Sequence, residues 1–336
     1  MRGKAMQRFD DGKSLAGARC TVLGANGFIG TNLCLALHRA GATVIGAGRS
    51  AAARAELAEK VTWRRADLAT GSGLDDAIRS SDFVFHLVNT LLPAPSNEAK
   101  SRDVEENLVG TLRLLELCRA HGVKKVIYAS SGGTVYGPQS VVPINEDAIP
   151  RPICSYGIVK HAVEGYLHLF RHLHQLDYVA LRIANPFGEY QMPHDQGLIA
   201  TLFGKALSRT PISIWGDGSV VRDYVYIQDV VEAIITSTTL DTPHSPRIFN
   251  IGSGVGKSVN DVIQSIASIH RDLPSVEYSP GRAADVPMNI LDIRRARDYL
   301  GWTPSTDWQS ALGITYRWLC GALDAAEGTH PYAATA

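Results

Sequence analysis

The stretch CTVLGANGFIG, residues 20–30, decides how the first part of this chain folds. Its first five residues form a short apolar run that predicts a buried strand, and TNLCLALHRAG at 31–41 predicts a helix closed by a glycine. A second apolar run, ATVIGA at 42–47, follows. This order predicts a βαβ unit whose glycines let the backbone approach a pyrophosphate at the helix N-terminus. The residues that we expect at this dinucleotide site are Gly24, Gly27, Phe28, Ile29 and Gly30.

The end of the second predicted strand indicates which dinucleotide binds. An acidic residue there would hydrogen-bond the adenosine ribose, whereas an arginine accommodates a 2′-phosphate. This chain has AGRS at residues 47–50 and no acid. We therefore expect NAD or NADP as the cofactor, and Arg49 with Ser50 favours NADP. The alternative is that Arg49 is a solvated surface residue.

Four more strand-like runs lie between residues 61 and 185, with helical patterns between them. Strands and helices that alternate in this way predict an α/β fold with a parallel, doubly wound sheet. Ligands of such sheets bind beyond the carboxyl ends of the strands. The strand ends that would share this crevice are 24–30, 48–50, Asp67 and Leu68 near an adenine edge, 87–89 beginning with Leu87, 130–134 and Asn185.

The composition argues against several classes of partner. Lys plus Arg and Asp plus Glu each number 33, so the formal net charge is zero and nothing indicates a nucleic-acid partner. The five cysteines are scattered, which argues against a disulfide framework or a zinc site and fits a reducing, cytoplasmic compartment. No apolar run reaches the roughly 18 residues that span a bilayer. We expect no membrane partner and no metal.

After Asn185 the pattern changes to short strand-like pieces between loops and short helices. We interpret this part as a smaller α/β substrate-binding cap that completes the site and is interleaved with the main domain. The expected organisation is a loose N-terminal extension at 1–18, a mainly dinucleotide-binding domain at 19–184 and a mainly substrate-binding domain at 185–330.

The segment SYGIVK, residues 155–160, carries a tyrosine and a lysine on one predicted helix face. Tyr156 and Lys160 are four residues apart, so in a helix they lie one turn apart. A free tyrosine titrates near ~10, and a lysine cation close by favours the phenolate and lowers the pKa of the phenol. The pair therefore predicts a general base for a sugar or alcohol hydroxyl. The alternative is a surface pair without a catalytic role.

The order of the motifs resembles the extended short-chain dehydrogenase/reductase family, and in particular its nucleotide-sugar epimerases and reductases. The resemblance implies a Rossmann fold, a bound nicotinamide dinucleotide, a nucleoside-diphosphate sugar and usually a homodimer built on helices. The stretches that carry it run from about residue 20 to 310 and are GANGFIG, NLVGTLRLLE, SSGGTVYG, SYGIVK, RIANPFG, WGDGSVVRDYVYIQDVV, FNIGSG and PGRAADV.

The resemblance also implies catalytic roles. Tyr156 is the base, and Lys160 lowers its pKa and holds the nicotinamide ribose. The serine or threonine with which the family hydrogen-bonds the reacting sugar oxygen is replaced by Gly132 in this chain. Ser131 or Thr134 must serve instead, and we favour Ser131. The carboxylates that dehydratases and decarboxylases carry in this stretch are absent, which disfavours both reactions.

Further roles follow from the same resemblance. Asn107, which opens the predicted amphipathic helix NLVGTLRLLE, belongs to the cofactor site. Arg222, Arg282 and Asn185 match residues that contact the substrate diphosphate, and a guanidinium fork suits phosphate oxygens. Asp285 matches an acid near the nucleoside end.

Three functions remain open. The leading one is a UDP-hexose type 4-epimerase that transfers hydride through a 4-keto intermediate. The second is an NADPH-dependent reductase of a 4-keto-6-deoxy nucleotide sugar, which Arg49 favours and which uses the same residues in one direction. The third is a non-catalytic dinucleotide-sensing protein, which would have no need for Tyr156 and Lys160 together.

Overall fold

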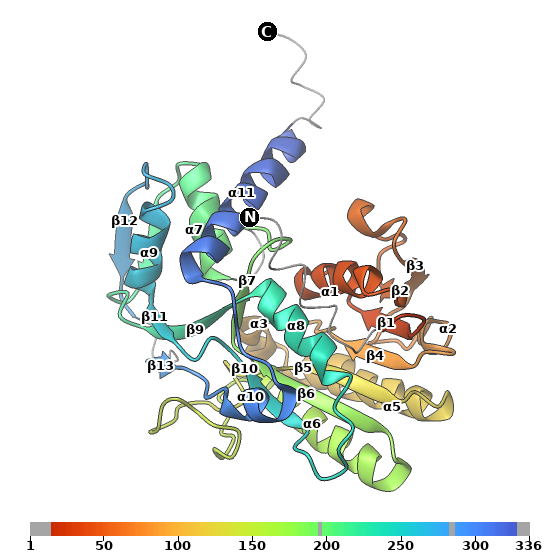
Figure 1. Cartoon of the computed structure of the whole chain (residues 1–336). Coiled ribbons are helices and arrows are strands. Elements are labelled where there is room, and N and C mark those ends of the chain that lie inside the picture. Colours follow the sequence, from red (N-terminus) through yellow and green to blue (C-terminus); the bar gives the residue numbers. More distant parts are fainter. Residues whose placement is uncertain (1–14, 194–196, 282–285, 328–336) are drawn as a thin grey trace.

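The computed structural model describes residues 15–193, 197–281 and 286–327, and its largest feature is a seven-stranded sheet (Figure 1). Every neighbouring pair of its strands is parallel. The strand order reverses between β1 and β4, which confirms the predicted doubly wound α/β fold, and sheets of this kind bind their ligands at such a reversal. In spatial order the strands are β10 (Ile248–Ile251), β6 (Asp177–Ile183), β5 (Lys125–Ser131), β4 (Phe83–His86), β1 (Arg19–Leu23), β2 (Thr43–Gly48) and β3 (Thr62–Arg65).

Helices bury both faces of this sheet, which explains why its strands read as continuous apolar runs. Along β5, Val126 and Tyr128 belong to one apolar cluster, and Ile127 and Ala129 belong to the other. The helices on the Val126 side are α2 (Leu74–Ile78), α5 (Gly110–Ala120) and α6 (Ser155–His174). On the Ile127 side lie α1 (Phe28–Arg39) and α8 (Ile227–Ser237).

The second half of the chain builds a smaller part beside the sheet (Figure 1). After its first strands, the chain returns to the large sheet, where β10 pairs with β6. The two parts are thus interleaved in sequence. The strands of the smaller part are β7 (Asn185–Phe187), β8 (Ile212–Trp215), β9 (Val221–Tyr226), β11 (Gly256–Ser258), β12 (Val276–Ser279) and β13 (Met288–Asn289). Its helices are α7 (Leu198–Leu207), α9 (Val259–Ala267) and α11 (Trp308–Glu327), whereas α10 (Arg294–Leu300) packs against β10 and α8 of the larger part.

Residues 15–18, which are predicted from the sequence to belong to a loose extension, pack against the folded part of the chain. Leu15 is buried in the core, and the Gly17 amide donates to the carbonyl of Gly41 at 3.0 Å. Residues 15–18 are therefore not loose, because they cover the loop between α1 and β2. Residues 1–14 and 328–336 lie outside the described part of the chain.

The helix that carries Asn107 begins earlier than predicted. It consists of α4 (Lys100–Asp103), a π-helical turn (Val104–Val109) and then α5. Asn107 lies inside the π turn, a feature that is frequent at functional sites. The short helix α3 (Pro93–Glu98), which starts with a proline at its first turn, precedes this unit.

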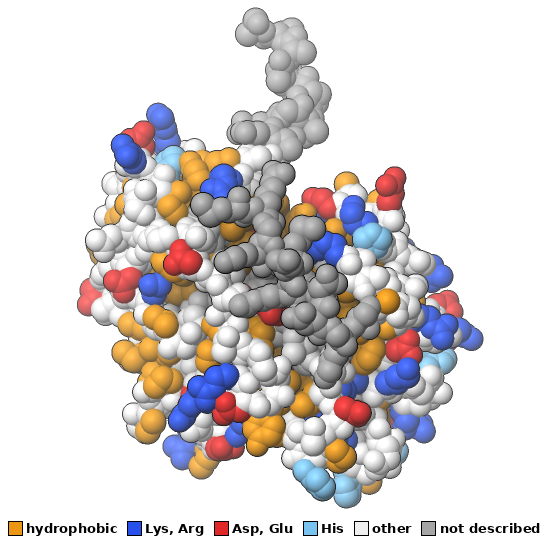
Figure 2. Space-filling view, viewed as in Figure 1, with side chains coloured by type: hydrophobic (Ala, Val, Ile, Leu, Met, Phe, Trp, Pro, Cys, Tyr) orange, Lys and Arg blue, Asp and Glu red, His pale blue; other side chains and the backbone are white. Residues whose placement is uncertain are grey.

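Two features of the surface bear on partners. On the face shown in Figure 2, acidic and basic side chains are interspersed. Among the described residues, no helix has both the length and the apolar character needed to cross a bilayer.

Candidate active site

The turn between β1 and α1 can hold a pyrophosphate. A Cβ atom on Gly30 would lie 2.8 Å from the Ala25 Cα and would overlap the Gly24 carbonyl, so only glycine fits there. Gly24 has a φ of 86°, which also favours glycine. No side chain caps the helix start at Gly27, and the amides of the first turn remain open to an anion. The predicted cradle, with Phe28 and Ile29 in the first turn, thus fits a dinucleotide.

The end of β2 lies open to solvent above a tryptophan. The Trp63 ring packs 3.2 Å from the position of a Cβ on Gly48, and its Nε1 donates to the Ser50 carbonyl at 3.1 Å. Arg49 and Ser50 are exposed. The pKa of Glu106 is lowered, chiefly by its hydrogen bond from Arg102, and the charge of Arg49 adds to the effect. The charge of Arg49 therefore acts on Glu106, which lies in the π turn.

The other predicted strand-end residues make contacts within the protein. Asp67 follows β3 and accepts a hydrogen bond from the Ala69 amide at 3.0 Å. Leu68 is buried, and its carbonyl lies against Gly110. Leu87 follows β4, and its amide donates to the carbonyl of Leu23 at 3.2 Å. Their contacts with a dinucleotide stay a prediction.

Helix α3 supplies the cap of helix α6. The Ser155 amide donates to the Asn97 Oδ1 at 2.9 Å, and the Tyr156 amide donates to the Ser96 Oγ at 3.0 Å. Ser96 is fully buried and its hydroxyl donates to the Pro93 carbonyl at 2.8 Å. Two of the amides that a helix start leaves unpaired are thus satisfied by a separate element. This arrangement fixes the place of Tyr156.

Lys160 joins α6 to the carboxyl end of β5. Its Nζ donates to the Ala129 carbonyl at 2.8 Å and lies 5.4 Å from the centroid of the Tyr156 ring. Burial lowers the pKa of Lys160 to about 7, while Asp103 and Glu164 act in the opposite direction. The predicted pair is therefore assembled at the edge of the sheet where ligands bind.

The pKa of the Tyr156 phenol is raised in the structure, whereas the sequence predicted that it would be lowered. Burial raises the pKa of Tyr156, and Cys154 and Asp103 add to the increase. Lys160 does not overcome these effects. Its Nζ lies over the Tyr156 ring, and because the pKa of Lys160 is about 7, the amine is only partly protonated near pH 7. Activation of this phenol consequently needs a further positive charge.

The structure explains why glycine stands at position 132. A Cβ there would overlap the Leu291 side chain and would lie 3.0 Å from the Arg182 carbonyl. Ser131 ends β5 and is half-buried. The Thr134 Oγ1 is buried and has no hydrogen-bond partner among the described residues. Both hydroxyls predicted to replace the missing one are thus near the strand end, and their roles stay predictions.

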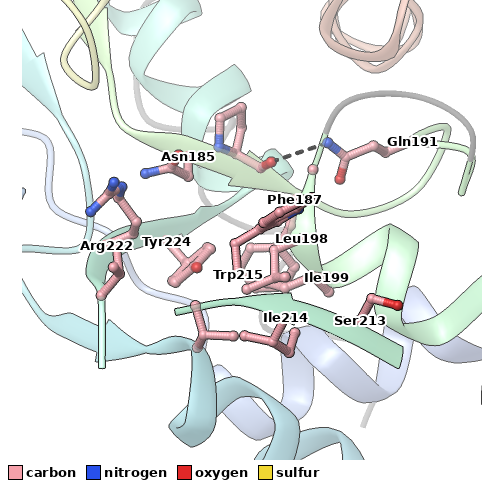
Figure 3. A pocket seen from close by; sticks show the side chains of 14 residues that line it. Asn185, Phe187, Gln191, Leu198, Ile199, Ser213, Ile214, Trp215, Arg222 and Tyr224 are labelled. Carbon is pink, nitrogen blue, oxygen red and sulfur yellow. Dashed lines mark hydrogen bonds between the residues drawn. The ribbon is translucent and has the colours of Figure 1, made fainter. Parts of the chain in front are cut away.

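A cavity of about 280 Å³ opens in the smaller part, next to β7, β8 and β9 (Figure 3). Arg222 and Asn185 lie at one side of it, and apolar side chains, among them Phe187 and Ile214, line its middle. The Arg222 Nη1 donates to the Val286 carbonyl at 2.7 Å. Because the two polar side chains are held beside an apolar lining, the cavity suits a ligand with an anionic and a ring portion.

Two predicted ligands of the substrate, Arg282 and Asp285, lie outside the described residues. The Asn185 Nδ2 donates to the Asp223 carbonyl at 2.8 Å, which orients its amide. The Asn107 side chain accepts from the Thr90 amide at 2.9 Å and donates to Asp103, also at 2.9 Å. Asn107 therefore supports the wall of the crevice through protein contacts.

Sequence reasoning missed Ser96, Asn97, Asp103 and Leu291. Ser96 and Asn97 are about 60 residues from the helix that they cap, and no local pattern reveals so distant a contact. For Asp103 a signal existed, because it lies four residues before Asn107 on one helix, where an Asn–Asp hydrogen bond is favourable.

Comparisons with known proteins show the family of the chain. The model of the NAD-dependent epimerase/dehydratase family matches residues 20–252. A UDP-glucose 4-epimerase of Mycolicibacterium smegmatis is 35% identical over 88% of this chain and 97% of its own length. A dTDP-4-dehydro-6-deoxyglucose reductase of Escherichia coli is 35% identical over 66% of this chain and 70% of its own length. A crystal structure of a Thermotoga maritima UDP-glucose 4-epimerase with UDP-glucose has a TM-score of 0.86 and 32% identity, and covers 91% of this chain and 99% of its own.

Proposed function

Because the chain belongs to the NAD-dependent epimerase/dehydratase family, we propose that it is a nucleotide-sugar 4-epimerase of the UDP-hexose type. The observation that carries this proposal is the contact of Lys160 with the carbonyl end of β5, one helical turn from Tyr156. It is supported by the glycine cradle on β1 and by the similar M. smegmatis and T. maritima enzymes, which are UDP-glucose 4-epimerases.

In the proposed mechanism, Tyr156 takes the proton of the sugar 4-hydroxyl and later returns it. A bound oxidised dinucleotide would supply the hydride acceptor and donor, and its positive charge would favour the Tyr156 phenolate that burial disfavours. Lys160 supports the same charge and stays anchored on Ala129. Ser131 or Thr134 donates a hydrogen bond to the sugar oxygen. Inversion requires the 4-keto sugar to turn its other face to the cofactor.

The cavity beside β9 is our proposed site for the nucleoside diphosphate. Arg222 and Asn185 lie at its polar side and suit the diphosphate oxygens. The apolar middle suits the base and ribose. Arg282 and Asp285 keep the roles that the resemblance implies, as proposals.

Arg49 is the residue on which we base a lean toward NADP. It is exposed at the end of β2, where no acid is present to bind the ribose hydroxyls. We expect Arg49→Ala to weaken NADP binding by about tenfold or more and to leave NAD binding nearly unchanged, because only NADP has a 2′-phosphate. Fluorescence titration of both cofactors checks this. Equal losses for both would assign Arg49 a general role.

The second candidate function is reduction of a 4-keto-6-deoxy nucleotide sugar. Arg49 favours it, since a reductase exchanges NADPH at each turnover, and one of the similar proteins is such a reductase. Release and identification of the dinucleotide that co-purifies with the protein separates the two candidates. Tightly retained NAD supports epimerisation, and a site that takes up NADPH reversibly supports reduction.

We also propose that the protein is a homodimer that forms through α6. Ile158, Leu169 and Leu173 are 55%, 42% and 59% exposed, and Tyr166 is 37% exposed. Their spacing puts these apolar side chains along one face of α6. A cytoplasmic location is proposed because all five cysteines carry free thiols.

Replacement of Tyr156 tests the function. Tyr156→Phe should lower kcat on UDP-glucose or UDP-galactose by at least about 100-fold, which is the usual contribution of a general base. Tyr299→Phe, at an exposed tyrosine of α10, is the matched control and should keep full activity. Full turnover in the Tyr156→Phe variant would overturn the assignment. A wild type that binds the dinucleotide but turns over no nucleotide sugar would support the sensing alternative.

A further inference from the structure

A buried carboxylate lies beside the Tyr156–Lys160 pair and has no part in the mechanism described above. Asp103, the last residue of α4, has no exposed surface. Its Oδ2 accepts from the Ser155 hydroxyl at 2.7 Å, and its Oδ1 accepts from the Asn107 amide at 2.9 Å. Ser155 immediately precedes the proposed base. Asp103 thus contacts the turn of α6 that presents Tyr156.

Among the described residues, Asp103 has no direct ionic partner. No basic nitrogen of the described residues lies within 4 Å of the Asp103 carboxylate. The other buried acid near the pair, Glu164, differs in this respect, because it accepts two hydrogen bonds of 3.0 and 2.7 Å from Arg182. A buried carboxylate that is hydrogen-bonded but forms no ion pair is still costly, and a nearby positive charge reduces this cost. Lys160 is the cation on which Asp103 acts electrostatically.

The other titratable groups around the pair, apart from Glu164, are neutral near pH 7. Burial lowers the pKa of His86 to about 3, with Lys160 adding to the decrease, and burial raises that of Tyr128. Burial also raises the pKa of the Cys154 thiol. The charge of Glu164 is compensated by Arg182. In the described part of the chain, Asp103 and Lys160 are thus the buried ionisable groups of this cluster that are left to face each other, and neither forms an ion pair.

We propose that Asp103 is a positioning residue that acts as the counter-charge of Lys160 and holds the first turn of α6, so that Lys160 stays charged beside the proposed base. This inference rests on the proposed function of Tyr156 and Lys160 and adds a third member to their unit. The contacts of Asp103 with Ser155 and Asn107 also join that unit to the loop after β4, because Asn107 holds Thr90.

The substitution Asp103→Asn separates charge from geometry. An asparagine can accept from Asn107 and donate to the Ser155 oxygen, so both hydrogen bonds are retained while the charge is lost. The charge of Asp103 raises the pKa of both Lys160 and Tyr156. Its removal should therefore shift both titrations to lower pH, by about one unit. Asp103→Ser is the second variant if the first does not fold.

The titration of Lys160 is measured by NMR of 13C-labelled lysine side chains, with Lys160→Arg for assignment. Glu105→Gln removes an exposed charge two residues after Asp103 and is the control. In this variant Lys160 should titrate as it does in the wild type. Ser155→Ala removes a hydrogen bond without removing charge, and should lower kcat without moving the titration. The pH–rate profile with UDP-glucose should shift in Asp103→Asn as the NMR titration does.

The outcomes distinguish this inference from the proposed function. If Lys160 titrates in Asp103→Asn and Asp103→Ser as in the wild type, Asp103 is not its counter-charge, whatever the activity. If the Lys160 titration shifts in Asp103→Asn but the wild type turns over no nucleotide sugar, Asp103 is the counter-charge of Lys160 and the epimerase proposal is wrong.

Discussion

Gly132 shows how a residue from a distant segment replaces a local side chain. Leu291, which is fully buried, fills the space that a side chain at 132 would need. The Asn289 Nδ2 also donates to the Gly132 carbonyl at 3.1 Å, so the end of β13 and the residues just after it hold this turn. The position at which the family resemblance implies a hydroxyl is consequently part of the packing between the two halves of this chain.

We predict that Gly132→Ser lowers the free energy of unfolding by about 1–3 kcal/mol, because the added atoms overpack a filled site. Leu291→Ala alone should cost about 2–5 kcal/mol through the cavity that it creates. In the double variant the serine should cost less than in the wild type, since Leu291 no longer opposes it. Urea unfolding of the four proteins measures this coupling, and strictly additive costs would contradict the overlap.

Helix α6 depends at its start on elements that precede it by about 60 residues. Ser96 and Asn97 provide the acceptors for its first amides, and Asp103 holds the hydroxyl of Ser155. The Ser155 segment contains no capping side chain of its own. The orientation of Tyr156 is therefore set by α3 and α4 rather than by the local sequence.

We predict that Ser96→Ala destabilises the protein by about 1 kcal/mol and also lowers kcat, because the Tyr156 amide loses its acceptor. Ser258→Ala is the matched control, since Ser258 caps α9 in a capping box away from the proposed base. It should cost similar stability and leave kcat unchanged. Thermal unfolding and steady-state rates test both. Equal effects of the two variants on kcat would show that the loss reflects stability alone.

Much of the fold follows from local patterns, and the details of the site do not. The apolar run of β1, the glycines 24, 27 and 30 and the apolar run of β2 are contiguous, so the βαβ unit could be predicted from adjacent residues. Tyr156 and Lys160 could be paired because helical periodicity relates them. The cap from Ser96 and the packing of Leu291 on Gly132 depend on contacts between distant segments, which periodicity does not report. The pKa of Tyr156 is raised, against the prediction, because the effect of burial is larger than the effect of the Lys160 charge.

At the scale of the whole molecule, we predict that Leu169→Glu combined with Leu173→Glu converts a dimer into monomers. Both side chains are exposed on the face of α6 proposed for dimerisation, and a carboxylate there would have to be desolvated on association. Light scattering after size exclusion measures the mass. Val141→Glu, at another exposed apolar residue outside the helices, is the control and should leave the mass unchanged. A wild type that is monomeric at micromolar concentration would contradict the proposed assembly.

The position of β10 has a consequence for how the chain is made. β6 ends at Ile183, yet its outer neighbour in the sheet starts only at Ile248. During translation, the nascent sheet therefore presents β6 as an open edge until about 65 further residues have emerged, and open edges recruit other strands. A chain cut before Ile248 would therefore leave β6 without its outer neighbour.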